Sequence, residues 1–285
     1  MKLPWVMRAL VLAALLLPRA LFAETSVSPD FVLSGSELDA LTKTVPREIR
    51  AGILAAPRQF LNQLALVLDE PADLFVLVDK SHALRPDYEP EDLVNIRAYS
   101  LNVSLGDVLL RRAIVPAARD LARAAKKDGI TLVFSSGYRS FAYQRYVYSR
   151  EVKMFGQQAA DRESARPGSS QHQLGTAVDF GSITDDFART PAGRWLAAHA
   201  WEHGFSLSYP EGFEDVTGYR YESWHYRFLT KPGVMLQRRY FGDVQQYMLE
   251  FMNEHRALLE SRRLTAAQGR RRVRRGTAPP RRRSR

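Results

Sequence analysis

Two short stretches of the sequence carry residues that could bind a metal ion and activate water. Residues 170–179 contain His172 and Asp179, and residues 222–225 contain Glu222 and His225. Two imidazoles and one carboxylate suit Zn²⁺, which keeps a catalytic water in its remaining position. We therefore predict that His172, Asp179 and His225 bind Zn²⁺, which leaves Glu222 free to act as a general base.

The neighbouring residues support a shared site. A strand over residues 177–180 would bury Val178 and Phe180 on one face and turn Asp179 to the other, where a carboxylate is costly unless it is paired or metal-bound. Taken alone, Asp179 is better explained as a turn cap and His172 as a surface loop histidine. Together with a later Glu-x-x-His, they favour a metal site. Because Glu222 and His225 would face opposite ways in a regular strand, we predict a bend or bulge between them.

The two stretches resemble the VanY-type D-alanyl-D-alanine carboxypeptidases. The shared patterns are Ser-x-His-x-x-Gly-x-Ala-x-Asp at 170–179 and Glu-x-Trp-His at 222–225. This family belongs to a zinc peptidase group that includes the VanX dipeptidases, and the Hedgehog signalling domain shares its fold. Further similarity at 77–93, 136–140 and 195–205 extends the resemblance over about residues 73 to 230.

The resemblance implies a fold, a reaction and a set of substrate-binding residues. The fold is α+β, with a small antiparallel sheet flanked by helices. The reaction removes the terminal D-alanine from peptidoglycan stem peptides or precursors, using zinc-activated water and Glu222 as the base. Arg139 would hold the substrate's terminal carboxylate, for which a guanidinium is well shaped. Tyr138, Ser170 and Gln144 are the other candidate substrate-binding residues, although the Ser170 hydroxyl could equally stabilise a turn.

Two other functions and one other metal motif compete with this interpretation. The first alternative is a related peptidoglycan endopeptidase or D,D-dipeptidase. The second is a non-catalytic, zinc-stabilised binding module, and the presence of Glu222 argues against it. His199, Glu202 and His203 also fit a His-x-x-Glu-His zinc motif. Gly204 is expected to end that helix, and histidine is favoured in a last turn, so we do not assign the metal there.

The chain ends differ in composition from the body. Residues 1–23 have two basic residues before an apolar run and read as a signal peptide, which would anchor the chain to a membrane if it is not cleaved. The net charge is +10, but residues 262–285 hold eleven arginines and residues 1–23 hold three basic residues, so residues 24–261 carry −4. We therefore expect an exported protein of the periplasm or cell envelope with a disordered arginine-rich tail.

The expected partners follow from these features. Peptides ending in D-Ala-D-Ala are the expected substrates, and the tail could contact an anionic wall polymer or lipid headgroups. No specific nucleic-acid binding is expected, and we predict a monomer. The absence of cysteine excludes thiolate ligands, a cysteine nucleophile and disulfides.

Hydrophobic periodicity predicts the elements that position the site. We expect a helical N-terminal extension over 24–72 and a zinc peptidase domain with a C-terminal helix over 73–261. Within that domain the expected elements are strands over 74–78 and 130–134, helices over 107–127, 141–154 and 232–260, and a polar loop over 157–170.

Overall fold

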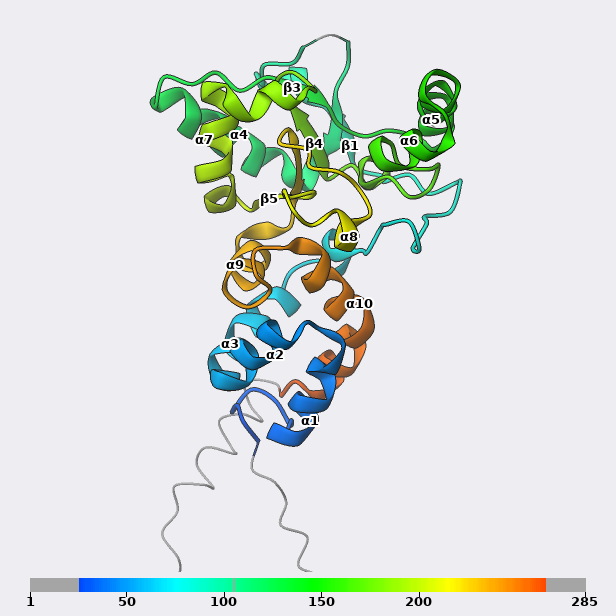
Figure 1. Ribbon diagram of the computed structural model, residues 1–285. Helices are drawn as coiled ribbons and strands as arrows, with labels where there is room; N and C mark the ends of the chain where they lie inside the picture. Colours follow the sequence, from blue (N-terminus) through cyan, green and yellow to red (C-terminus); the bar gives the residue numbers. More distant parts are fainter. Residues whose placement is uncertain (1–25, 105, 265–285) are drawn as a thin grey trace, which may run out of the picture.

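A small antiparallel sheet lies at the centre of the upper half of the computed structural model, which describes residues 26–104 and 106–264 (Figure 1). Its four strands run in the order β3-β4-β6-β5, and β1 and β2 form a separate antiparallel pair. The predicted α+β class with a small antiparallel sheet is confirmed. The strands are β1 (Leu93–Asn95), β2 (Leu109–Arg111), β3 (Phe134–Ser136), β4 (Ala177–Phe180), β5 (Phe205–Leu207) and β6 (His225–Phe228).

Helices flank this sheet on two sides. In Figure 1, α4 and α7 lie on one side and the α5–α6 pair lies on the other. The predicted helix over 141–154 is present as α5. The helices of this half are α4 (Val115–Lys127), α5 (Phe141–Phe155), α6 (Gln157–Glu163), α7 (Pro191–His199) and the short α8 (Glu214–Thr217).

A second group of helices forms the lower half of the molecule (Figure 1). Here α3 packs along α9, and the Phe60 and Tyr240 rings meet edge to face at 5.2 Å. The Leu264 amide donates to the Asp30 carbonyl at 2.7 Å, so the two ends of the described chain meet. The helices are α1 (Gly35–Leu41), α2 (Arg47–Ala55), α3 (Pro57–Leu68), α9 (Thr230–Tyr240) and α10 (Gln245–Arg262).

The two faces of the four-stranded sheet differ in character. Phe134, Phe180 and Tyr226 gather on one face, with ring centroids 5.0 Å apart for the first two and 5.8 Å apart for the last two. They belong to the same buried cluster as Leu121 of α4 and Leu196 of α7. Because side chains alternate along a strand, this apolar packing directs the intervening polar residues to the opposite face.

The predicted strand over 74–78 is wrong. Its first residues instead end a short 3-10 helix, Ala72–Phe75. The carbonyls of Leu74 and Val76 accept hydrogen bonds from Nη2 of the buried Arg227, at 3.0 and 2.8 Å. A side chain therefore satisfies the backbone groups that a neighbouring strand would otherwise bond, and the apolar residues are buried without one.

The helix predicted over 107–127 begins only at Val115. Residues 109–111 form β2, paired with β1, and Pro116 occupies the first turn of α4, where proline is tolerated. The strand predicted over 130–134 is also displaced, since β3 starts at Phe134. A short apolar run shows that a segment is buried, but it does not show which of its residues find a partner strand.

Two further boundaries differ from the predictions. The stretch 157–170 begins with the helix α6 before it becomes a loop. The helix predicted over 232–260 is divided into α9 and α10, because Gly242 and Asp243 both adopt positive φ angles, of 63° and 61°. Within the described residues, no helix is long and apolar enough to span a membrane. The predicted signal peptide and residues 265–285 of the predicted tail lie outside the described residues. The disorder predicted for residues 262–264 is wrong, because Arg262 ends α10 and the Leu264 amide bonds the Asp30 carbonyl.

Candidate metal centre and active-site cleft

The polar face of the sheet brings the predicted metal ligands together. Asp179 on the inner strand β4 pairs with Ser136 of β3 on one side and with His225 of β6 on the other. Residues paired across antiparallel strands present their side chains to the same face. The sheet register therefore places Asp179 beside His225, although 46 residues separate them in the sequence.

His172 reaches the same point from a turn that leads into β4. The 3-10 helix Gln171–Leu174 carries it, and Ser170 caps this helix by accepting a hydrogen bond from the His172 amide at 3.3 Å. Gly175 then adopts a φ of 68°, a left-handed conformation that favours glycine, and the chain turns into the strand. The Ser-x-His-x-x-Gly pattern thus encodes a capped turn that points His172 toward Asp179.

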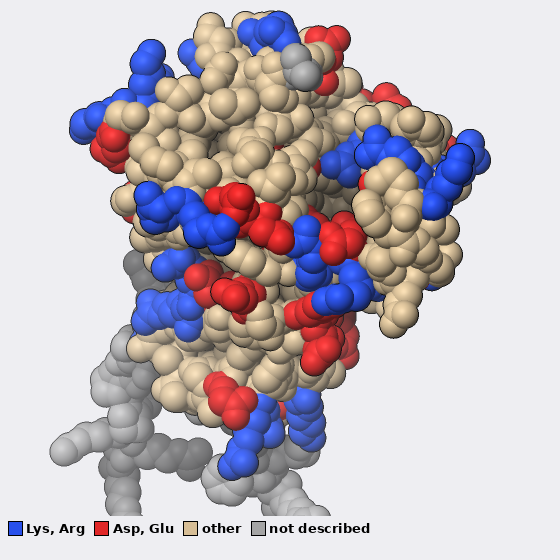
Figure 2. Space-filling model, turned by 45° about the horizontal axis from the view of Figure 1, so that its top comes forward, with Lys and Arg blue, Asp and Glu red and all other residues tan. Residues whose placement is uncertain are grey.

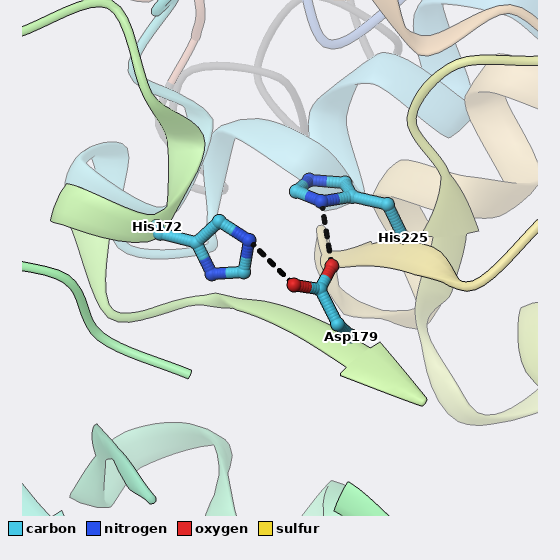
Figure 3. Close-up of side chains that lie close together, drawn as sticks. All are labelled: His172, Asp179 and His225. Atoms are coloured by element: carbon cyan, nitrogen blue, oxygen red, sulfur yellow. Dashed lines mark hydrogen bonds and ion pairs between the residues drawn. The ribbon is translucent and has the colours of Figure 1, made fainter. Parts of the chain in front are cut away.

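Figure 3 shows Asp179 between the two imidazoles. One carboxylate oxygen lies 3.1 Å from His172 Nε2, and the other lies 2.9 Å from His225 Nδ1. One possible ligand atom from each residue lies within 4.8 Å of the others, and all three residues are buried. Two nitrogens and a carboxylate oxygen that converge in this way match the donor set of a catalytic zinc site.

The hydrogen bonds behind the site suit metal binding. His172 Nδ1 donates to the Gly137 carbonyl at 2.6 Å, which leaves Nε2 with a free lone pair toward Asp179. Burial, together with the nearby charge of Arg139, lowers the pKa of His172 to about 4, so this ligand is neutral at pH 7. Burial opposes ionisation of Asp179, but His172 and His225 hold the pKa of its carboxyl well below the usual range. The three residues therefore fit Zn²⁺, as predicted.

Glu222 lies next to this centre in the predicted bend. The His225 amide donates to the Glu222 carbonyl at 3.1 Å, which closes a turn immediately before β6. Glu222 Oε2 is 3.8 Å from His225 Nδ1. Burial, and the negative charge of Asp179, raise the pKa of Glu222 to about 8. A carboxyl beside a metal-bound water could accept a proton from it and later return that proton.

Arg139 lies beside the metal ligands and is held on several sides. Its Nη2 donates to Ser136 Oγ and to Asp179 Oδ2, both at 3.1 Å, and its Nη1 donates to Gln144 Oε1 at 3.0 Å. A guanidinium has five N–H groups, so these bonds leave two of them for a substrate. The side chain is thus fixed in direction while remaining partly accessible.

The other three candidate substrate-binding residues have different surroundings. Ser170 lines the cleft, and its hydroxyl hydrogen remains available to a ligand because the cap uses only the oxygen. Gln144 also lines the cleft, but it is buried between Arg139 and the Ala165 carbonyl, to which it donates at 2.7 Å. The structure does not bring Tyr138 to the site: its hydroxyl donates to Glu89 at 3.2 Å, away from the residues that line the cleft.

The metal centre opens into a cleft of ≈ 450 Å³. Figure 2 shows a hollow on this face with charged side chains of both signs around it. Sequence reasoning did not identify Tyr209, whose ring lies 4.9 Å from that of His225, or Arg220, which lies over the Trp224 ring. It also missed Gln171, although the position inside the Ser-x-His pattern was a signal. The cleft is also lined by Tyr143, Arg150, Glu151, Glu163, Ile183 and Tyr219.

The competing His-x-x-Glu-His motif lies elsewhere. His199 and Glu202 form a partly exposed pair at 3.2 Å near the end of α7. Gly204 follows with a φ of 82° and ends the turn, as expected. Within the described residues, the one group of three potential ligands that could hold a metal is His172, Asp179 and His225.

Comparisons with known proteins identify a family to which the sequence is similar. The family model for VanY, described as D-alanyl-D-alanine carboxypeptidase, matches residues 107–231. The bifunctional D-Ala-D-Ala dipeptidase and carboxypeptidase VanXYC of Enterococcus gallinarum is 32% identical over 55% of this chain and 83% of its own length.

Two solved structures have a fold similar to that of this chain. The LdcB LD-carboxypeptidase is 32% identical, with a TM-score of 0.56 over 62% of this chain and 85% of that one. A mutant of the vancomycin-resistance D,D-pentapeptidase VanY, in complex with Zn(II), is 26% identical, with a TM-score of 0.52 over 62% of this chain and 99% of that one.

Fold and site together define a zinc-dependent peptidase. The sheet supplies Asp179 and His225, the capped turn supplies His172, and the Glu222 carboxyl lies beside them. Within that class, the chain belongs to the VanY family of D-alanyl-D-alanine carboxypeptidases.

Proposed function

We propose that this protein hydrolyses the last peptide bond of peptidoglycan stem peptides or precursors that end in D-Ala-D-Ala. The observation that carries the proposal is the conjunction of a buried His-Asp-His ligand set with the adjacent carboxyl of Glu222, 3.8 Å from His225 Nδ1. A structural metal site has no need of that carboxyl, which argues against a non-catalytic binding module. The related VanXYC protein is named for action on D-Ala-D-Ala, which supports the choice of substrate.

The residues of the chain have distinct roles in this reaction. His172, Asp179 and His225 would hold Zn²⁺, which when bound supplies a lowered pKa for water and polarises a carbonyl. Glu222 accepts a proton from the attacking water and delivers it to the leaving amine. Arg139 offers its two free N–H groups to the terminal carboxylate of the substrate, and the Ser170 hydroxyl donates to the bound peptide.

The test is incubation of the zinc-loaded protein with defined peptides, followed by mass spectrometry. A pentapeptide ending in D-Ala-D-Ala should lose one alanine residue. Hydrolysis of free D-Ala-D-Ala to two alanines, with the pentapeptide left intact, would favour the dipeptidase alternative. Cleavage of an internal bond in a cross-linked muropeptide would favour the endopeptidase alternative.

An L,D-carboxypeptidase is a second candidate, because the LdcB structure carries that activity in its name and shares 32% identity with this chain. Such an enzyme removes the D-alanine that follows an L-centre of a tetrapeptide. Both peptides should therefore be offered separately. Cleavage of the tetrapeptide with no cleavage of the pentapeptide would replace the D,D assignment by the L,D assignment.

The location and the tail also enter as proposals. We infer export to the periplasm or cell envelope from the apolar run that follows two basic residues in residues 1–23, with anchoring to the membrane if this segment is retained. The arginine-rich tail would then contact anionic wall polymers or lipid headgroups, since it carries no acidic residue. We propose a monomer in which one chain supplies every residue of the site.

A further inference from the structure

A line of buried hydrogen bonds connects the first residue of α10 to His225. Gln245 Nε2 donates to Ser208 Oγ at 3.0 Å, and Ser208 Oγ donates to Gln171 Oε1 at 2.7 Å. The same Gln171 oxygen lies 3.3 Å from His225 Nε2. No residue in this line is more than 3% exposed. Because water hardly reaches these groups, each must take its hydrogen-bonding role from its neighbours.

The direction of the line is fixed at its far end. Gln245 Nε2 also faces the backbone carbonyl of Ser206 in β5, at 3.4 Å. A carbonyl can only accept, so it keeps the NH₂ group of Gln245 on this side. The Ser208 hydroxyl therefore accepts a hydrogen bond from Gln245 and donates one to Gln171. The carbonyl oxygen of Gln171, rather than its NH₂ group, consequently faces His225.

This direction determines which nitrogen of His225 is free to bind a metal. A neutral imidazole has one N–H group and one lone pair. The ring lies between two acceptors, Gln171 Oε1 on the Nε2 side and Asp179 Oδ1 on the Nδ1 side. A metal ion bound beside Asp179 needs the Nδ1 lone pair, and Gln171 Oε1 then accepts the hydrogen that Nε2 carries. Nδ1 is the nitrogen that faces Asp179, at 2.9 Å, and Glu222, at 3.8 Å. Histidine ligands commonly donate their second ring nitrogen in this way, which fixes both tautomer and orientation.

We propose that Gln171, Ser208 and Gln245 are positioning residues that set the tautomer of His225, and that α10 thereby supports the metal centre. The inference rests on the metal site of the proposed function. It extends the support of the metal site to α10, in the lower half of the molecule. Gln245 begins that helix and lies outside residues 107–231, which the family model matches.

Zinc affinity, measured by competition with a chromogenic chelator, tests this proposal. Gln171→Leu should weaken binding by about 10–100-fold, the usual effect of losing such a partner. Gln171→Glu keeps an acceptor toward His225 and should retain the wild-type affinity. Gln245→Leu frees the Ser208 hydroxyl to rotate and should cause a smaller loss. Gln246→Leu is the matched control, because the neighbouring Gln246 is also buried but donates to Asp79 and Glu250.

NMR of the zinc-loaded proteins supplies a readout that loss of stability alone would not change. The Nε2–H signal of His225 should be downfield and protected from exchange in the wild type and in Gln171→Glu. It should move upfield in Gln171→Leu and remain in place in Gln246→Leu.

Three results would overturn the inference. Unchanged affinity with an unmoved signal in Gln171→Leu would exclude the role of Gln171, and equal losses in Gln245→Leu and Gln246→Leu would exclude the line from α10. If Gln171→Leu does not fold, failure of Gln171→Glu to retain affinity is equally decisive. Absence of zinc binding in the wild type would instead remove the metal site itself, and the proposed function with it.

Discussion

At the scale of single residues, the metal site requires all three of His172, Asp179 and His225. The three ligand atoms converge inside a buried pocket, so removing one side chain leaves an incomplete set of metal ligands. His172→Ala and His225→Ala should therefore lose most of the zinc, measured by metal analysis of the purified proteins. His199→Ala is the control and should retain about one zinc per chain. Retained zinc in both ligand variants would exclude the site, and loss in the control would restore the competing motif.

Glu222 can be separated from metal binding because it is not one of the ligands. Glu222→Gln keeps the size of the side chain but cannot accept a proton. It should bind zinc normally and lose about 10²–10⁴-fold in kcat, the range typical of a general base. Peptide turnover and zinc content should be measured on the same sample. Near-wild-type turnover in the zinc-loaded variant would contradict the assigned role.

Arg139 should affect substrate recognition through geometry as well as charge. Arg139→Lys keeps a positive charge but cannot bond Ser136, Gln144 and Asp179 while also reaching a carboxylate. We expect a clear fall in kcat/KM on a peptide ending in D-Ala-D-Ala, and a larger fall for Arg139→Ala.

Amidation of the substrate's terminus distinguishes carboxylate recognition from support of the metal ligand. Amidation should weaken the wild type strongly and Arg139→Ala much less. If it weakens both proteins equally, Arg139 does not bind the terminal carboxylate. If the wild type cleaves both substrates alike, the endopeptidase alternative gains support.

At the scale of elements, the turn between β3 and α5 couples packing to the metal site. A Cβ on Gly137 would lie 2.3 Å from the Leu109 carbonyl, and the Gly137 carbonyl accepts the hydrogen bond from His172. Gly137→Ala should destabilise the fold by about 1–3 kcal/mol and weaken zinc binding, because the turn must shift. Chemical denaturation and a zinc titration measure the two effects.

A glycine far from the site supplies the control. Gly52 lies within α2 with nothing within 4 Å of an added Cβ, so Gly52→Ala should stabilise the fold by about 0.5–1 kcal/mol without changing zinc affinity. Equal behaviour of the two variants would show that Gly137 has no special role.

At the scale of the whole molecule, charge is separated between the body and the tail. Residues 24–261 carry −4, whereas the last 24 residues hold eleven arginines. Truncation after residue 264 should leave kcat/KM on a small soluble peptide unchanged, because the site is complete within the described residues. The same truncation should weaken retention on phosphate-rich wall polymer or anionic vesicles, and added salt should weaken retention of the full chain. Equal, salt-independent retention of both proteins would remove the role of the tail.

The sequence by itself determined the chemistry of the site. The residue types and the capped turn at 170–175 are local properties, so His172, Asp179, Glu222 and His225 could be singled out, and the α+β class followed from the family resemblance. The helix over 141–154 was likewise visible because a helix is built from neighbours in the chain.

The tertiary structure alone decided everything that depends on distant partners. The backbone of residues 74–76 is satisfied by Arg227, which is about 150 residues away, so an apolar run that suggests a strand forms none. Tyr138 is adjacent to Arg139 in the sequence, but its hydroxyl bonds Glu89 and does not face the cleft. Gln245 is connected to the metal centre through the side chains of Ser208 and Gln171. These three residues are distant in the sequence and meet only because the start of α10 contacts β5. Hydrogen-bond direction in a buried network is set by its neighbours in space, which the order of residues does not record.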